Sequence, residues 1–393
     1  MKVAPLTIAA ILVIGLLALI VWQWPGLLSR FAFAPTQTSV EQGLTELPTA
    51  LPTRPATSSD ESAASTEPIS IVADNLDIPW EVAWLPDGTM LITERPGTLL
   101  AISNGERTSI PLPDTRETGE SGLLGLAVHP RFNQTNWLYL YRTTPSGQAL
   151  TNRVERYTLR DNQLTERTVL ISDIPGAQFH DGGRIAFGPD GYLYITTGDA
   201  TEPELAQDRD SPAGKILRLS EDGQLPPDNP FNTPIYSWGH RNPQGLAWDA
   251  AGRLWATEHG RSGAQSGLDE INLIKPGQNY GWPTIEGDAT APNLVEPVMH
   301  SGASDTWAPA GAAIIGNKLF FTGLRGESLY EATIQGENLT NLKQHFRQQF
   351  GRLRAVTVGP DGALYISSSN TDGRGTVQAN DDKIIRLNPS IFE

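Results

Sequence analysis

The first residues that could do chemistry are a histidine and an aspartate at the two ends of one short segment. His180 opens the stretch HDGGRIAFGPDGYLYITTGD and Asp199 closes it, with two β-rich runs and a Pro-Asp-Gly turn between them. If the two runs pair as a hairpin, both side chains lie at the same rim. A carboxylate beside a histidine fixes its tautomer and stabilises the imidazolium, which makes the histidine a candidate general base. A histidine before a strand is otherwise more often structural, so this assignment depends on the pairing.

A second candidate group consists of residues that stand at equivalent positions beside other β-rich runs: Arg241, Asn242, Arg325, Arg352 and Arg354. Residues two apart in a strand share a face, so the guanidinium groups of Arg352 and Arg354 are expected to point the same way. Four arginines at one rim would form a positive patch for a small polyanion such as a tricarboxylate. The alternative is that each guanidinium pairs with one of the many carboxylates of this acidic chain.

A glycine-rich excursion, ATEHGRSGAQSGLDEINLIKPGQNYGWP, carries the adjacent acids Asp269 and Glu270 and, further on, Tyr280. Carboxylate oxygens and the carbonyls of an irregular loop are the ligands that calcium accepts. Acidic pairs are commonly just solvated, and the spacing is not that of an EF-hand. The chain has no cysteine and no H-x-x-x-H spacing, which argues against a zinc site.

Composition excludes several other classes of protein. Without cysteine there is no disulfide framework and no thiol nucleophile, and the chain also lacks a G-x-S-x-G elbow, a P-loop and a dinucleotide fingerprint. A net charge of -15, from 29 Lys and Arg against 44 Asp and Glu, repels nucleic acid. Charged residues make up only 19% of the chain and lack helix-face spacing, so the composition indicates a β-rich protein.

The elements that must position these residues follow from an internal repeat in which two short β-rich runs flank a turn. It recurs six times, every 40 to 65 residues or so, at 81–94, 125–142, 184–199, 245–260, 311–323 and 355–369. This period is typical of a four-stranded propeller blade, and the repeats predict an all-β, six-bladed β-propeller with its site at the mouth of the axial channel. Two separate β-sandwiches would not explain six copies. Only 330–350 has any helical character.

The N-terminal part of the chain differs in composition from the repeats. Residues 3–24 are almost entirely apolar and about long enough to span a bilayer. We interpret 1–34 as a signal peptide or a membrane anchor, which places the protein in the periplasm or elsewhere outside the cytoplasm. Residues 35–68 are rich in Pro, Thr and Ser without an aromatic residue, and they are expected to form a disordered linker. Residues 69–393 form the propeller domain.

Seven motifs in order along the chain are ESGLLGLAVHPRF, FHDGGRIAFGPDGYLYITTGD, AGKILRL, GHRNPQGLAWD, TEHG, DEINLIKPGQNYGWP and GRLRAVTVGPDGALYISSS. Together they resemble the soluble aldose sugar dehydrogenases that use pyrroloquinoline quinone, the glucose/sorbosone dehydrogenase family. The resemblance runs from about Ile71 to Leu387. It implies a six-bladed propeller that binds the quinone with calcium over the axial mouth and oxidises the anomeric hydroxyl of an aldose to a lactone.

The resemblance also implies individual roles. His180 matches the catalytic base, with Asp199 as its carboxylate partner. Quinone contacts are implied at Glu120, Arg241, Asn242, Arg325, Arg352 and Arg354. Arg325 stands where the family more often has Lys. Glu120 stands where some members have Gln, so this chain is expected to place a carboxylate near an anionic cofactor.

For calcium, the resemblance implies two sites. One ion would lie against the quinone, held by backbone carbonyls at about Gly260 and Arg261. A second, structural ion would be held by Glu270 and the carbonyl of Tyr280. Without cysteine there is no haem-attachment motif, so electrons must leave to a separate acceptor, either a soluble redox carrier or a membrane quinone.

Two other functions stay open from the residues alone. A calcium-dependent propeller lactonase would need several side-chain carboxylates converging on one ion and would not need four arginines at the rim. A non-catalytic propeller that displays a binding surface would need no cofactor. Binding of quinone distinguishes both from a dehydrogenase.

Overall fold

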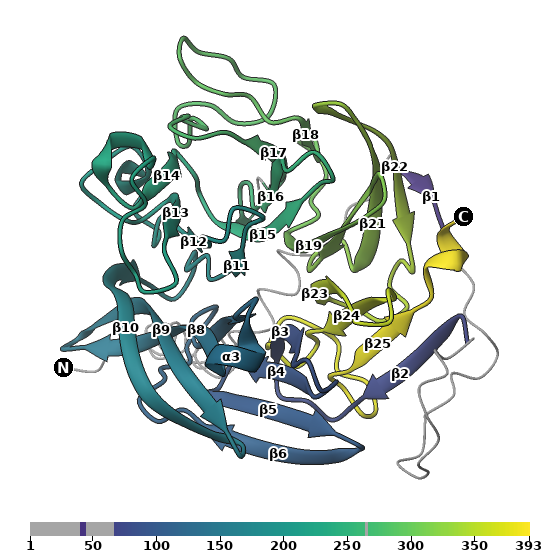
Figure 1. Cartoon of the computed structure of the whole chain (residues 1–393). Coiled ribbons are helices and arrows are strands. Elements are labelled where there is room, and N and C mark those ends of the chain that lie inside the picture. Colours follow the sequence, from purple (N-terminus) through teal and green to yellow (C-terminus); the bar gives the residue numbers. More distant parts are fainter. Residues whose placement is uncertain (1–39, 45–66, 264–265) are drawn as a thin grey trace, which may run out of the picture.

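The computed structural model describes residues 40–44, 67–263 and 266–393, and these ranges form a ring of six twisted sheets around a central axis (Figure 1). Five blades have four strands each and the sheet of the fifth blade has an additional one. The strands β3, β7, β11, β15, β19 and β23 lie nearest the axis and pack against one another around the ring. The predicted six-bladed β-propeller is confirmed.

In blades one to five, four antiparallel strands follow one another outward from the axis in chain order. Blade one contains β3 (Pro79–Trp84), β4 (Met90–Glu94), β5 (Thr98–Ser103) and β6 (Glu106–Pro111). Blade two contains β7 (Leu123–Val128), β8 (Trp137–Ser146), β9 (Ala149–Arg160) and β10 (Gln163–Gly176). Blade three contains β11 (Ile185–Phe187), β12 (Leu193–Thr197), β13 (Lys215–Leu219) and β14 (Ile235–Trp238).

The second half of the ring follows the same plan. Blade four contains β15 (Pro243–Trp248), β16 (Leu254–Glu258), β17 (Glu270–Ile274) and β18 (Met299–His300). Blade five contains β19 (Pro309–Ile315), β20 (Lys318–Gly323), β21 (Ser328–Gln335) and β22 (Asn338–His345).

Short helices occur at α3 (Phe132–Thr135), η1 (Pro203–Ala206), η2 (Pro230–Asn232) and η4 (Pro389–Phe392).

Blade six closes the ring with strands from both ends of the propeller domain. Its inner strands are β23 (Leu353–Val358), β24 (Leu364–Ser368) and β25 (Ile384–Leu387). Its outer strand is β2 (Ile69–Ala73), which pairs antiparallel with β25. The first and last strands of the domain therefore share one sheet, which fixes the circle of blades.

The apolar core is divided into six clusters, one at each interface between neighbouring blades. Successive side chains of a strand point to opposite faces, so one strand serves two interfaces. In β4, Ile92 packs against blade six and Leu91 packs against blade two. The inner strands are therefore apolar on both faces, which explains why the repeats contain near-continuous hydrophobic runs.

Each sequence repeat corresponds to the inner strands of one blade, and all six predicted hairpins are present. In the repeats 81–94, 184–199, 245–260 and 355–369, the turn between the two strands contains a glycine with positive φ, where a side chain would be strained. These glycines are Gly88, Gly191, Gly252 and Gly362. In the second repeat the connection is longer and contains α3.

Two expectations are corrected. The segment 330–350 is not helical: its residues form most of the hairpin of β21 and β22, which turns at Gly336 with φ 62°. Within the expected linker 35–68, β1 (Glu41–Gln42) pairs in parallel with β22 as the fifth strand of blade five (Figure 1). These sequences pair because partner strands supply their hydrogen bonds, a tertiary effect that composition does not report.

The predicted signal peptide or anchor, 1–34 with its apolar stretch 3–24, lies outside the described residues, as does most of the linker. In the ranges that the structure describes, no helix is long and apolar enough to cross a membrane.

Candidate active site at the axial mouth

The candidate catalytic pair lies at the rim where the innermost strands begin and the second strands end. His180 precedes β11 and Asp199 follows β12. Because β11 and β12 pair antiparallel, the hairpin brings the two side chains together, and His180 Nδ1 lies 2.7 Å from Asp199 Oδ1. The side chain of Asp199 is fully buried, whereas that of His180 is 15% exposed. The predicted pairing is present, and it leaves His180 Nε2 as the nitrogen available to a ligand.

The backbone around the histidine is held tightly. His180 has φ 65°, and Gly198 packs so closely against its carbonyl that a Cβ there would overlap it. The next residue, Asp181, is buried and accepts hydrogen bonds from Asn152 Nδ2 at 2.8 Å and from the Ala177 amide at 3.2 Å. The imidazole therefore sits on a rigid support, as general-base catalysis requires.

Glu120 joins the catalytic pair to blade four. Its Oε2 accepts a hydrogen bond from the His180 amide at 3.0 Å and lies 3.5 Å from Asn242 Nδ2. Asn242 in turn accepts a hydrogen bond from the Gly182 amide through Oδ1, at 2.9 Å. Residues from blades two, three and four thus meet at one point of the rim.

Arg241 lies beside this point with part of its donor set unused. It donates to the carbonyl of His259 at 3.3 Å and to Ser262 Oγ at 3.1 Å, while its buried Nε has no partner. Its guanidinium stands 5.3 Å from the ring of Trp282. Burial lowers the pKa of Arg241, although Asp199 and Glu120 oppose this change. Free donors on a buried cation are what an anionic ligand would satisfy.

Arg352 and Arg354 point the same way, and a single carboxylate lies between them. Asp372 Oδ2 accepts from Arg352 Nη2 at 2.9 Å and lies 3.6 Å from Arg354 Nη2. For these two arginines the alternative from the sequence is met, because they pair with a carboxylate. One acid for two guanidinium groups leaves an excess of positive charge, and burial lowers the pKa of Arg354 to about 9.

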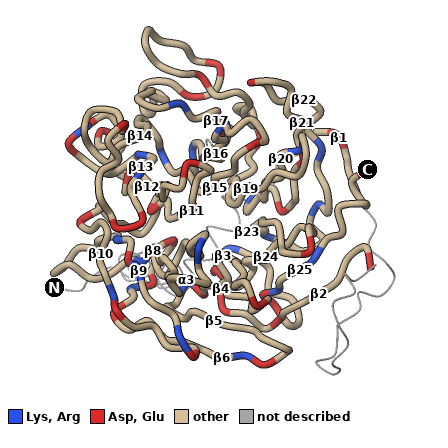
Figure 2. The backbone as a smooth tube through the Cα atoms, viewed as in Figure 1, with Lys and Arg blue, Asp and Glu red and all other residues tan. Residues whose placement is uncertain are grey.

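Arg325 follows β20 and extends toward the loop after β16, where its Nη1 donates to Ser266 Oγ. Figure 2 shows blue Lys and Arg segments near the inner strands of the ring, with red Asp and Glu segments among them. The four predicted arginines thus come from three different blades, four, five and six. They therefore surround the axial opening on several sides.

The loop predicted to hold the cofactor calcium is folded back on itself. Arg261 and Gly267 form a bridge, with the Arg261 amide donating to the Gly267 carbonyl at 2.8 Å. A Cβ at Gly260 would overlap the carbonyls of Gly267 and Leu268, so only glycine fits. The Gly260 amide donates to Asp269 Oδ1 at 2.8 Å. Backbone carbonyls crowd this loop, and the acid Asp269 is a structural acceptor within it.

Glu270 begins β17 of blade four, and Tyr280 belongs to the apolar cluster between blades three and four. Glu270 Oε1 accepts from the Gly287 amide at 3.0 Å, and burial together with Glu258 raises the pKa of Glu270 to about 8. The Tyr280 ring stacks on His240 at 4.8 Å. In the described part of the chain Glu270 and Tyr280 share no hydrogen bond, and no three His, Asp or Glu side chains gather to hold a metal.

Several residues at or near the site were not predicted from the sequence. Trp282 Nε1 donates to Asp199 Oδ2 at 2.8 Å, and Glu258 Oε2 lies 2.8 Å from His240 Nδ1. Asp372 and Arg374 come from the loop after β24. Trp282 and Glu258 stand inside the recognised motifs NYGWP and TEHG, which was the available signal. Nothing in the sequence singles out Asp372 or Arg374.

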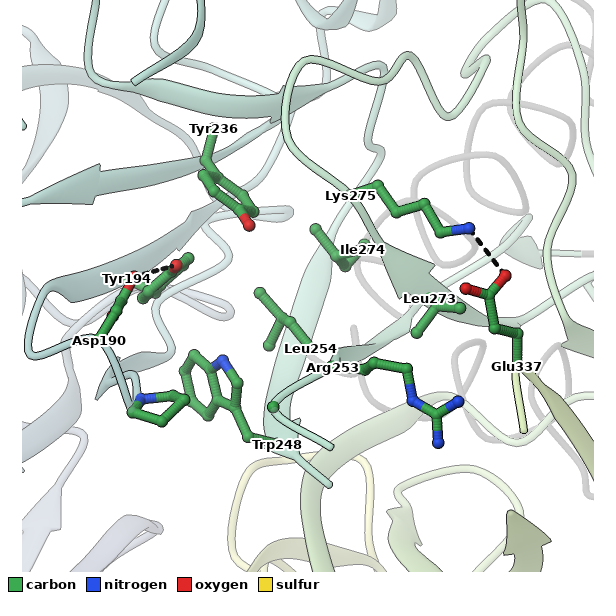
Figure 3. Close-up of a pocket in the computed structure, with 12 residues that line it drawn as sticks. Asp190, Tyr194, Tyr236, Trp248, Arg253, Leu254, Leu273, Ile274, Lys275 and Glu337 are labelled. Atoms are coloured by element: carbon green, nitrogen blue, oxygen red, sulfur yellow. Dashed lines mark hydrogen bonds and ion pairs between the residues drawn. The ribbon is translucent and has the colours of Figure 1, made fainter. Parts of the chain in front are cut away.

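A separate cavity of about 190 Å³ lies between blades three and four (Figure 3). It is lined by Asp190 of the β11–β12 turn, Arg253 of the β15–β16 turn, and the aromatic rings of Tyr194, Tyr236 and Trp248. These turns are at the strand ends opposite to His180. The cavity is therefore distinct from the axial mouth, and the candidate catalytic residues do not line it.

At its axial mouth this β-propeller has a candidate general base beside buried cations that an anionic ligand could satisfy, and comparison with known proteins assigns the chain to a family. The family model of glucose/sorbosone dehydrogenases matches residues 76–385. Aldose sugar dehydrogenase YliI of Escherichia coli is 33% identical over 353 residues, covering 79% of this chain and 92% of YliI.

Solved structures agree. The PQQ-bound aldose sugar dehydrogenase of Streptomyces coelicolor superposes with a TM-score of 0.75 at 38% identity, covering 81% of this chain and 97% of that one. A glucose dehydrogenase-type oxidoreductase of Thermus thermophilus gives a TM-score of 0.77 at 44% identity, covering 81% and 99%. The chain belongs to the glucose/sorbosone dehydrogenase family and is an oxidoreductase that acts on sugars.

Proposed function

We propose that this protein uses pyrroloquinoline quinone and calcium to oxidise the anomeric hydroxyl of aldose sugars to lactones. The observation that carries the proposal is the His180–Asp199 pair at the axial mouth, with 2.7 Å between Nδ1 and Oδ1, beside the buried Arg241. The quinone-bound structure of the Streptomyces coelicolor relative supports the choice of cofactor.

The charges and unpartnered donors of these residues fit a bound polyanion. Arg241 Nε and His259 Nε2 are buried without a hydrogen-bond partner, and both lie on the segment between β14 and the loop after β16. Arg352 and Arg354 share one carboxylate, so a bound carboxylate would restore their charge balance. We propose Glu120, Arg241, Asn242, Arg325, Arg352 and Arg354 as the quinone contacts.

The donor set also fits calcium. Glu270 is a buried acid whose pKa is raised by burial and by Glu258, and the neighbouring Asn272 Oδ1 is buried without a partner. A divalent cation bound by oxygen would relieve both conditions. We propose Glu270 and the Tyr280 carbonyl for a structural ion, and the carbonyls of Gly260 and Arg261 for an ion against the quinone.

In the mechanism that follows, His180 Nε2 removes the proton from the anomeric hydroxyl. Asp199 keeps Nδ1 protonated and stabilises the imidazolium that forms. Trp282 fixes the other carboxylate oxygen, so Asp199 cannot rotate away. When bound, pyrroloquinoline quinone would accept the hydride from the sugar carbon, with calcium polarising its carbonyl.

Two electrons then leave to a separate acceptor, because the chain has no cysteine for a covalently attached haem. We propose a soluble redox carrier or a membrane quinone for this role. An extracytoplasmic, periplasmic location is consistent with the N-terminal apolar stretch 3–24, which could also tether the enzyme to a membrane.

Reconstitution tests the proposal. The full chain is stripped of metal, and quinone is added with and without calcium while reduction of an artificial dye is followed with a panel of aldoses. We expect dye reduction only when both are present. We also expect calcium alone to raise the melting temperature of the apo-protein, and the variant E270Q to lose most of this rise.

Two results would contradict the proposal. Wild-type protein that binds no quinone and reduces no dye would exclude a quinone dehydrogenase, and lactone hydrolysis with calcium alone would then be measured. Full dye reduction in the absence of quinone would show that the electrons take another path.

A further inference from the structure

Glu120 forms an ion pair with an arginine from a loop of another blade. Arg374 Nη1 lies 3.0 Å from Glu120 Oε1, while the other oxygen of Glu120 accepts the His180 amide at 3.0 Å. The side chain of Glu120 is 12% exposed and that of Arg374 is 29% exposed. The two residues are 254 positions apart in the chain and belong to different blades.

A carboxylate at this position needs an explanation. Every other charged side chain proposed to contact the quinone is an arginine, which suits a cofactor that carries carboxylates. Burial opposes the ionisation of Glu120, but Arg374, His180 and His259 hold the pKa of its carboxyl well below the usual range. Glu120 is therefore an anion in a pocket for an anion, and only a nearby cation makes this tolerable.

One short loop supplies that cation and also organises the arginines. Asp372 bridges Arg352 and Arg354 through Oδ2, and its Oδ1 accepts from the Arg374 amide at 3.0 Å. Gly375 packs against the Arg352 side chain, where a Cβ would approach Cδ to 3.0 Å. The position of the Arg374 backbone is thus tied to the same carboxylate that holds the two arginines.

The Arg374 guanidinium has a second neighbour besides Glu120. It lies 5.2 Å from the ring of Phe179, the residue before His180. Stacking on Phe179 and the ion pair with Glu120 hold it in one orientation beside the catalytic histidine. Arg374 therefore contacts both neighbours of the His180 backbone, Phe179 in sequence and Glu120 in space.

We propose that Arg374 is a positioning residue of this site: it supplies the counter-charge that allows Glu120 to remain a carboxylate next to the anionic cofactor and to hold the His180 amide. This inference rests on the proposed function.

The test is a double-mutant cycle on quinone affinity, measured by titrating metal-loaded apo-protein and following the quinone absorbance. R374Q leaves Glu120 unpaired, and we expect quinone affinity to fall by about tenfold or more. Adding E120Q to this variant removes the carboxylate that repels the anionic quinone. The quinone affinity of E120Q/R374Q is therefore expected to return to within about threefold of wild type. The rescue distinguishes charge compensation from a purely structural role.

A matched control is available at the opposite rim. Arg253 is also 29% exposed and pairs with Asp249 at 2.7 Å, near the cavity of Figure 3. R253Q removes an equivalent ion pair without touching the axial mouth, and it should leave quinone affinity unchanged.

Unchanged affinity in R374Q, or an equal loss in R374Q and in the double variant, would overturn the inference while leaving the proposed function intact. Failure of the wild-type protein to bind quinone would overturn both.

Discussion

At the scale of single residues, the site depends on a division of labour between the two ring nitrogens of one histidine. Asp199 occupies Nδ1 of His180, so only Nε2 can take a proton. We expect H180N to bind quinone with nearly wild-type affinity and to lose turnover by a factor of about 10² to 10⁴, because general-base catalysis contributes about that much. Single-turnover dye reduction, together with quinone titration, measures the two effects separately.

D199N provides the companion measurement, because it keeps the shape of the side chain but removes the charge that stabilises the imidazolium. Its turnover should fall by at least about tenfold. If H180N retained wild-type turnover, His180 would not be the base, whatever the behaviour of D199N.

The neighbouring Asp181 predicts a pH dependence of stability. Ser121 Oγ lies within hydrogen-bond distance of the Ala177 carbonyl and 3.0 Å from Asp181 Oδ2, and its one hydrogen can serve only one of these acceptors at a time, so a protonated Asp181 can donate to Ser121 when the hydroxyl turns to Ala177. Burial, with a contribution from Glu120, raises the pKa of Asp181 to about 6, against opposing hydrogen bonds. Since its folded-state pKa lies above the unfolded value, Asp181 stabilises the fold below about pH 4, and this stabilisation is lost as pH rises through 6.

The variant D181N tests this sign. Asparagine imitates the protonated acid, since its amide can donate to Ser121 Oγ while its carbonyl accepts from Asn152 and Ala177. In urea unfolding of the apo-protein, the stability of D181N relative to wild type should increase between pH 4 and 7 by about 1–3 kcal/mol. A constant difference across this range would show that Asp181 is ionised throughout.

At the scale of elements, contacts within one hairpin could be predicted from the sequence, whereas contacts between distant segments could not. The hairpin of His180 and Asp199 could be predicted because its turn residues, its alternation and its chemistry lie within 20 residues. The partners of Arg352 and Glu120 could not be predicted from the sequence. Asp372 and Arg374 lie in the irregular loop after β24, and no sequence pattern indicates where such a loop runs. Likewise, β22 is rich in polar residues, and its sequence alone suggested a helix. It forms a strand because β21 supplies its hydrogen-bond partners.

The strand β1 is an element that composition concealed. Its residues lie in a Pro/Thr/Ser-rich stretch, yet the Leu44 amide donates to His345 Nδ1 at 2.9 Å and the Phe346 amide donates to the Leu44 carbonyl at 2.7 Å. Leu44 also packs against the cluster between blades five and six. Without β1, the outer edge of β22 would present unpaired backbone groups.

We therefore expect a chain beginning at residue 45 to be less stable than one beginning at residue 40. Loss of these hydrogen bonds and of the Leu44 contact should cost about 1–3 kcal/mol, seen as a lower urea midpoint with an unchanged slope. The chain that begins at residue 40 serves as the control, since it keeps β1. Equal midpoints for the two chains would mean that β1 contributes nothing to the stability of blade five.

At the scale of the whole molecule, the ring is what makes the site possible. The candidate residues come from five blades, so any two neighbouring blades contain only part of the site. Their relative positions are fixed by six interblade clusters, each of which depends on both adjoining sheets. Opening the ring at any interface would therefore change the axial mouth as well as the stability.

The closing strand β2 is the place to test this dependence. Ile69 and Ala73 of β2 are buried, and β2 covers β25, whose Ile384 and Ile385 face the two interfaces of blade six. A chain that begins at residue 74 would expose this edge and should form oligomers, with a melting temperature at least about 10 °C below that of the chain beginning at residue 45, which also lacks β1. Light scattering and thermal unfolding measure both properties. A peptide of residues 67–74 added in excess should pair with β25 and restore the monomer together with quinone binding. If the truncated chain is instead monomeric with an unchanged melting temperature, blade six is stable with three strands.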